Sequence, residues 1–144
     1  MARILTPFEI YAKKVPFTED IWELTEDLRF HVESPDSTNV IIAKKGRRTD
    51  FSSTPFGVRN FFPKDDIDNA AAIFHDLLYE FCGDLPLENF EGEERVYTRK
   101  QADKMFYDIG QICGLHPIKG QIKYRALRLF GWVAWEKHKK ELVS

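Results

Sequence analysis

The stretch Asn69-Ala-Ala-Ala-Ile-Phe-His-Asp-Leu-Leu-Tyr-Glu80 decides the fold of this chain. At about 100° per residue, its apolar side chains fall in one arc, which predicts an amphipathic helix over 69–81. His75 and Tyr79 lie together just beyond one edge of that arc, because residues four apart share a helical face. Asp76 lies on the far side. A histidine beside the apolar arc is well placed to face a second helix.

Composition limits the kind of protein this is. The chain has 144 residues, of which 43% are apolar and 14% aromatic, and we therefore predict one packed domain, 1–144. A net charge of −2 gives no argument for a nucleic-acid partner. The sequence has no long apolar run, and its first ten residues do not resemble a signal peptide, so we expect a protein made in the cytoplasm without a transmembrane segment. Cys82 and Cys113 are too few for a disulfide scaffold, and buried free thiols are the favoured interpretation over a single bridge.

The spacing of apolar residues changes along the chain and predicts an α+β fold. Residues 1–55 are expected to be mainly β, as a small antiparallel region, and residues 66–140 mainly α, with three helices. From 22 to 32 the alternation fits either a strand pair or one long bent strand, and Val40–Ala43 is expected to form a further strand.

Local signals divide the C-terminal part into its elements. Thr98 and Gln101 form a capping box, which predicts the start of a second helix. A final helix is expected over 117–140, with Gly131 inside it at a close crossing. The acidic stretch 84–94 predicts a mobile surface loop between the first two helices.

The stretch 49–55, rich in hydroxyl residues, predicts a structured loop that leaves the sheet. Asp50 within it could cap a turn, bind a metal or orient His75. The phenylalanines in and after this loop either cover one end of the core or form an apolar wall facing a substrate: Phe51, Phe56, Phe61 and Phe62.

Asp103 falls at one edge of the second helix's apolar stripe, as His75 does on its own helix. Packing the two stripes together would bring the side chains within about 2.6–3.2 Å, with Tyr79 bonded to the same carboxylate. A histidine held by a carboxylate through one nitrogen keeps the other free as a general base. A hard, calcium-like cation, if bound, would take Asp76 or Asp50 as a ligand, rather than zinc taking cysteines. The alternative is a buried hydrogen bond that only fixes the register of the helices.

His75-Asp76-Leu-Leu-Tyr79, followed by Ala102-Asp103-Lys-Met-Phe106, resembles the helix pair of secreted phospholipases of the A2 class and of their shortened viral relatives. The resemblance implies that His75 activates a water molecule, that Asp103 orients His75, that Tyr79 supports Asp103 and that Asp76 binds calcium. The glycine-rich calcium loop of those enzymes is replaced here by 49–63, and their disulfides are absent.

A second resemblance extends from about Phe30 to Gly131 and rests on four motifs in order. These motifs are similar to those of a phage and prophage family, the domain of unknown function 1353 family, and they imply a bacteriophage source. They are Thr49-Asp-Phe-Ser-Ser-Thr-Pro55, Ala70-Ala-x-x-x-His-Asp-x-Leu-Tyr79, Ala102-Asp-x-x-Phe106 and Tyr124-Arg-Ala-Leu-Arg-Leu-Phe-Gly131.

Three functions follow as hypotheses. The first is a hydrolase acting on lipid or cell-wall material while a phage infects or leaves its host. The second is a non-enzymatic virion component, such as a tail, baseplate or connector protein, with other virion proteins as partners. The third is an accessory protein that stays in the host bacterial cytoplasm, where all three would be made.

Overall fold

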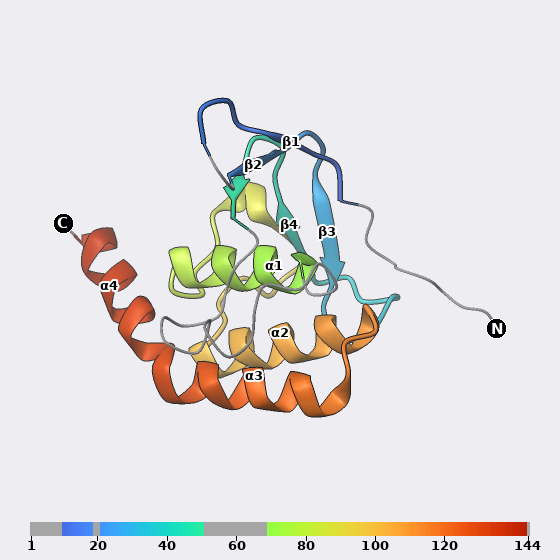
Figure 1. The fold of residues 1–144 in the computed structure, drawn as a ribbon, viewed down its shortest axis with the longest axis vertical. Helices are drawn as coiled ribbons and strands as arrows, with labels where there is room; N and C mark the ends of the chain where they lie inside the picture. The colour runs from blue at the N-terminus through green and yellow to red at the C-terminus, as the bar shows by residue number, and fades with distance from the viewer. Residues whose placement is uncertain (1–9, 19–20, 51–68, 144) are drawn as a thin grey trace.

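The computed structural model of the protein describes residues 10–18, 21–50 and 69–143. In these residues, five of the six strands of two small antiparallel sheets precede the α-helices, so the expected α+β fold is confirmed (Figure 1). The phenylalanine-rich stretch, the loop beyond Asp50 and the expected helix start near residue 66 lie outside the described residues. No helix of the described part is long and apolar enough to cross a membrane.

The first sheet contains β1 (Ala12–Lys14), β2 (Trp22–Leu24) and β5 (Arg48–Thr49), in the order β1-β2-β5. The second contains β3 (Leu28–His31), β4 (Val40–Ala43) and β6 (Phe90–Glu91), in the order β3-β4-β6. All pairs of neighbouring strands within each sheet are antiparallel. The expected strand Val40–Ala43 is therefore present.

The alternating stretch 22–32 forms two strands, β2 and β3, that belong to different sheets and do not pair with each other. Hydrogen bonds from the residues that follow β4 hold the turn between β2 and β3. Asp27 accepts hydrogen bonds from the backbone N–H of Lys45 at 2.7 Å and from the Lys44 ammonium at 2.9 Å. These bonds lower the pKa of Asp27 and direct the chain from one sheet to the other.

The stretch 84–94 is more than the surface loop that its acidic sequence predicts, and that prediction was wrong. It includes a 3-10 helix, η2 (Leu87–Asn89), and the strand β6, which pairs with β4. Leu85 and Asn89 are buried, and the Asn89 amide donates to the Ile42 carbonyl at 2.9 Å. Local sequence could not reveal this, because the pairing partner lies about fifty residues earlier in the chain.

Helix α1 (Asn69–Glu80) occupies the centre of the molecule, between the strands and α2 (Arg99–Ile112) (Figure 1). Every described residue from Asn69 to Glu80 is helical, and the end of the helix lies within one residue of the predicted one. Phe74 is fully buried and packs on Phe30 of β3, with ring centroids 5.7 Å apart. The central helix thus shares one core with the sheets, and its opposite edge faces α2.

Helix α2 begins at the predicted capping box. The Thr98 hydroxyl accepts from the Gln101 backbone N–H at 3.1 Å, and the Gln101 side chain accepts from the Thr98 N–H at 2.8 Å. Gly83, with φ +80°, allows the chain to leave α1, since a Cβ there would overlap the Tyr97 carbonyl. These two ends fix how α1 and α2 lie against each other.

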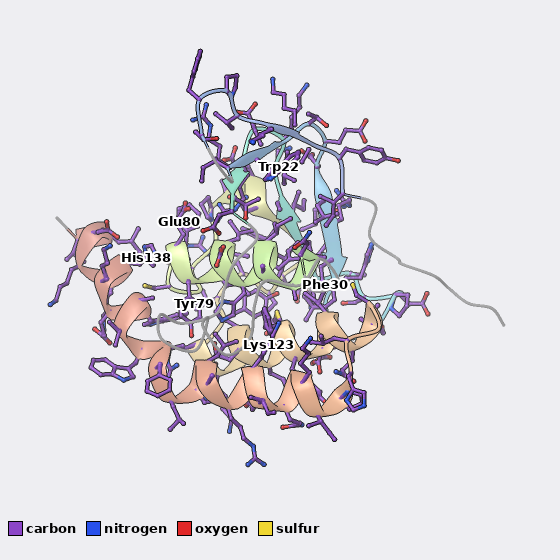
Figure 2. The ribbon with its side chains drawn as sticks, in the orientation of Figure 1. Trp22, Phe30, Tyr79, Glu80, Lys123 and His138 are labelled. Carbon is purple, nitrogen blue, oxygen red and sulfur yellow. The ribbon has the colours of Figure 1, made fainter. Side chains whose placement is uncertain are left out.

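The predicted last helix is present as two consecutive helices, α3 (Pro117–Phe130) and α4 (Trp132–Val143). They meet at Gly131, where a Cβ would lie 2.3 Å from the Tyr79 hydroxyl oxygen, so the expected close crossing is confirmed. In Figure 2, Tyr79 extends from α1 toward this junction.

Cys82 and Cys113 form no disulfide, as expected, although they are half-buried rather than fully buried. The Cys82 thiol donates to the Trp135 carbonyl at 3.3 Å, and burial raises the pKa of this thiol. The contact joins the end of α1 to α4.

Candidate functional site

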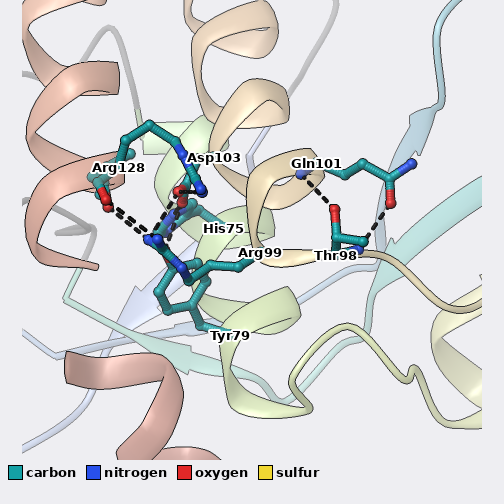
Figure 3. A network of polar contacts seen from close by, with 8 residues as sticks. His75, Tyr79, Thr98, Arg99, Gln101, Asp103 and Arg128 are labelled. Carbon is teal, nitrogen blue, oxygen red and sulfur yellow. Dashed lines mark hydrogen bonds and ion pairs between the residues drawn. The ribbon is translucent and has the colours of Figure 1, made fainter. Parts of the chain in front are cut away.

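Asp103, on α2, is the centre of the polar cluster and has no exposed surface. Its Oδ1 accepts a hydrogen bond from His75 Nε2 at 2.8 Å and another from the Tyr79 hydroxyl at 2.6 Å (Figure 3). The predicted meeting of His75 and Asp103, with Tyr79 on the same carboxylate, is confirmed. It follows from the position of each residue at the edge of an apolar helical stripe.

Two arginines occupy the other oxygen of the same carboxylate. Arg128 Nη1 donates to Asp103 Oδ2 at 2.7 Å, and Arg99 Nη1 donates to it at 3.3 Å. Arg99 also donates to the carbonyls of Leu127 at 3.0 Å and Arg128 at 3.2 Å. These carbonyls belong to the last turn of α3, and the Leu127 carbonyl also accepts from the Gly131 backbone N–H at 2.8 Å. The cluster therefore joins α1, α2 and the end of α3 through one carboxylate (Figure 3).

Aromatic rings surround the imidazole. The His75 and Tyr79 rings are 4.2 Å apart at a tilt of 34°, and Phe106 meets His75 edge-on at 5.6 Å. Trp135 of α4 meets Tyr79 edge-on at 5.1 Å. Only 3% of the His75 surface is exposed, so the rings fix the imidazole plane and exclude bulk water from its bond to Asp103.

Burial alone would raise the pKa of Asp103, but the hydrogen bonds from His75, Tyr79 and Arg128 outweigh burial and lower it. Burial, followed by the bond to the Asp103 carboxylate, raises the pKa of Tyr79 well above its ordinary value. Asp103 is therefore an anion at neutral pH, and Tyr79 is a neutral phenol that donates to it.

The geometry assigns the protons of the imidazole. Because Nε2 faces a carboxylate that only accepts, Nε2 carries a hydrogen, and Nδ1 of neutral His75 is the nitrogen with a lone pair. That tautomer is the one a general base requires, with Asp103 placed to stabilise the imidazolium formed after proton uptake. The two arginines reduce this stabilisation, since their charges already oppose that of Asp103.

Asp76 and Asp50, the predicted oxygen ligands of a hard cation, are both half-buried. Asp76 is on α1 beside His75, and Asp50 directly follows β5. Across 10–18, 21–50 and 69–143, no group of three or more His, Cys, Asp or Glu residues could hold a metal ion. Calcium takes six to eight oxygen ligands, so the described carboxylates do not make up such a set.

Sequence reasoning missed Arg99 and Arg128. Arg99 precedes Asp103 by four residues on one helix, and that spacing could have revealed it. Arg128 has no local relation to Asp103, because 25 residues and a turn separate them. Its contribution depends on how α3 crosses α2.

Fold and site together define an α+β protein with a buried His–Asp–Tyr cluster to which two arginines are bound. The chain belongs to the family described as "Protein of unknown function (DUF1353)", whose profile matches residues 22–127, well over half of the chain. No curated protein and no solved structure matches it. The resemblance to this family is thereby confirmed.

Proposed function

We propose that this protein is a hydrolase in which His75 is the general base, Asp103 orients it and Tyr79 supports Asp103. The observation that carries the proposal is the 2.8 Å bond from His75 Nε2 to a carboxylate with no exposed surface. This bond fixes both the tautomer and the plane of the ring. The hydrogen-bonding roles are those that the likeness to phospholipases of the A2 class implies for these three positions.

In the proposed reaction, Nδ1 of His75 takes a proton from a water molecule whose oxygen attacks the carbonyl carbon of an ester or amide. The imidazolium that forms keeps its bond to Asp103, and it returns the proton to the leaving group when the bond to the carbonyl carbon breaks. The substrate class is lipid or cell-wall material, and the setting is a phage that infects or leaves a bacterial host. The similarity of the motifs to phage and prophage proteins supports this setting.

A hard, calcium-like cation is not needed for any of these steps. If one takes part, Asp76 and Asp50 are the carboxylates that would contribute to holding it. Chelation would then lower the activity of the wild type, and Asp76→Asn would remove that response.

The variant His75→Asn tests the proposal, because it keeps most of the volume but removes the base. We expect hydrolysis of phospholipid vesicles or peptidoglycan to fall about 10²-fold or more, while the midpoint of thermal unfolding stays nearly unchanged. His116→Asn is the matched control, since exposed His116 caps α3 and asparagine also caps helices well. A wild type inactive on both substrates would contradict the proposal.

One observation favours a second candidate, a non-enzymatic virion component in which the cluster is structural. Asp103 receives four donors from three helices, and a catalytic aspartate needs only the histidine. In that case His75→Asn leaves Asp103 short of a donor, and the free energy of unfolding should fall by about 1–3 kcal/mol. Activity and unfolding measurements on the same variant therefore separate the two functions.

A further inference from the structure

Helices α3 and α4 expose an unusual number of large apolar side chains. Six of them, each at least 40% exposed, make up what we call the α3–α4 outer face: Ile118, Ile122, Leu129, Phe130, Trp132 and Val133. Single exposed apolar residues are ordinary on soluble proteins, whereas a group along consecutive helices marks an interaction surface.

Three of the four exposed apolar residues of α3 share one side of the helix. Ile118, Ile122 and Leu129 follow at spacings of four and seven, while buried Lys123 and Leu127 lie on the opposite side. Figure 1 shows α3 along one edge of the molecule, with α2 covering its inner side. The α3–α4 outer face therefore has no cover from the other described helices.

The charge of this region is opposite to that of the rest of the chain. Residues 117–143 contain seven Lys and Arg against two Glu, whereas the remainder contains 14 basic against 21 acidic residues. Four of the cations are exposed, and no ion pair joins them to another residue of the described ranges: Arg125, Lys137, Lys139 and Lys140. Exposed apolar side chains flanked by unpaired cations are typical of a helix that lies on an anionic membrane.

We propose that the α3–α4 outer face docks on an anionic lipid bilayer. The apolar side chains would enter the boundary between headgroups and acyl chains, and the cations would face lipid phosphates. Trp132 suits this boundary, where tryptophan is enriched in membrane proteins. A second copy of the chain is the poorer occupant, because symmetric pairing would bring two surfaces of the same positive charge together.

A shallow groove on the same face fits a lipid. Its volume is about 410 Å³, and it is lined by Tyr107, Pro117, Ile118, Gln121, Ile122 and Arg125. Apolar walls can receive part of an acyl chain. A guanidinium is well suited to a phosphate, since it can donate two parallel hydrogen bonds to phosphate oxygens.

The α3–α4 outer face is adjacent to the polar cluster. Phe130 and Trp132 flank Gly131, where an added Cβ would lie 2.3 Å from the Tyr79 hydroxyl oxygen, and Arg128 connects the end of α3 to Asp103. A bilayer bound here would lie beside the cluster. That lipid rather than cell-wall material is the substrate rests on the proposed function, whereas the docking surface itself does not.

The test is sedimentation of the full chain with vesicles of phosphatidylcholine, either alone or mixed with phosphatidylglycerol. We expect binding to the mixed vesicles only, with a strong decrease at about 0.5 M salt, where screening is short-ranged. Phe130→Ser combined with Trp132→Ser, and separately Lys137→Glu combined with Lys140→Glu, should each weaken binding about tenfold or more.

Matched controls lie away from this face. Leu87→Ser removes another exposed apolar side chain, and Lys14→Glu with Lys45→Glu reverses two exposed cations of the β region; both should bind as the wild type does. The proposal is overturned by three results. They are no binding to phosphatidylglycerol vesicles at low salt, equal losses in the control variants, and a dimer that Phe130→Ser with Trp132→Ser converts to a monomer.

Docking and hydrolysis are separable in this experiment. His75→Asn should bind phosphatidylglycerol vesicles as tightly as the wild type, even if it hydrolyses nothing. Binding by a wild type that lacks activity would keep the docking surface and remove the proposed hydrolase. Hydrolysis of anionic vesicles that is unaffected by the α3–α4 variants would support the hydrolase and overturn the docking surface.

Discussion

Helices α1 and α4 have the same length, twelve residues, and opposite environments. Nine residues of α1 are buried, including three alanines, whereas no residue of α4 is buried. Helix α1 shares the core with the sheets and contributes His75 and Tyr79 to the polar cluster. Helix α4 touches this core mainly through Trp135, which packs on Tyr79 and accepts from Cys82.

The difference in burial shows that packing restricts the choice of residues in α1 much more than in α4. Residues of α1 must satisfy packing and hydrogen bonding at once, so substitutions there should affect the free energy of unfolding. Trp132 and Val133 of α4 are more than half exposed, and their apolar character gives the folded chain little stability. Large apolar residues without a packing role are consistent with the lipid-docking surface that we propose.

The largest expected effect is at Asp103, the residue on which three helices depend. Asp103→Ala removes the acceptor of four hydrogen bonds and leaves Arg99 and Arg128 without their counter-charge. We expect the free energy of unfolding, measured with urea, to fall by about 3–5 kcal/mol. Asp108→Ala on the same helix breaks only the exposed pair with Lys104 and should cost less than about 1 kcal/mol. Equal losses in the two variants would mean that the cluster does not hold the helices.

The next effect concerns the junction of α3 and α4. Gly131→Ala places a methyl group 2.3 Å from the Tyr79 oxygen, whose position is fixed by its bond to Asp103. We expect a loss of about 1–3 kcal/mol in urea unfolding, because a packed site must expand.

Gly120→Ala, in α3, is the control for that substitution. Its Cβ would lie 2.7 Å from the Gln111 amide nitrogen, at the far end of a long side chain, and 3.2 and 3.3 Å from two ring carbons of Tyr107, and alanine favours a helix. The cost should therefore stay below about 1 kcal/mol. A larger loss at Gly120 than at Gly131 would contradict the close crossing.

The lowered pKa of Asp103 should make the free energy of unfolding depend on pH, with a change smaller than the loss in Asp103→Ala. The unfolded chain should protonate this carboxyl near its ordinary pKa of 3.8, and the folded protein only at lower pH. The stabilisation is therefore complete above about pH 5 and is lost as pH falls through 3.8 toward the folded value. Urea unfolding between pH 6 and about pH 3 should show the difference between wild type and Asp103→Asn shrinking toward acid. A constant difference would refute the linkage.

The smallest effect is expected on α4. Trp132→Ser should change the free energy of unfolding by no more than about 0.5 kcal/mol, because this side chain is 55% exposed. In α1, the much milder Ile73→Val should cost about 0.5–1.5 kcal/mol, since Ile73 is fully buried. Thermal melts of the two variants compare the helices directly, and a more costly Trp132→Ser would mean that α4 is part of the core.

Elements whose signals are local could be predicted from the sequence. The helical spacing of apolar residues predicted α1, and Thr98 with Gln101 predicted the start of α2. Strand β6 could not be predicted, because two residues acquire strand structure only by pairing with β4. The break at Gly131 was also hidden, since its φ of −63° is ordinary for a helix and only the contact with Tyr79 distinguishes it.

The same distinction applies to the candidate site. His75, Tyr79 and Asp103 could be placed together because each lies at the edge of an apolar stripe, and packed stripes bring their edges together. Arg128 could not, since its position depends on the crossing of α3 over α2. The number of cations around Asp103 could therefore not be predicted from the sequence. That number bears on whether the carboxylate is reactive or structural.

The late position of β6 in the sequence also affects how the chain folds during its synthesis. Strand β4 leaves the ribosome with β3 on one edge, but its other partner is translated about fifty residues later. Until then its free edge can pair with other chains, and nascent chains shorter than about 90 residues are exposed to aggregation. The β3-β4-β6 sheet can therefore be completed only after the segment that follows α1 has been synthesised.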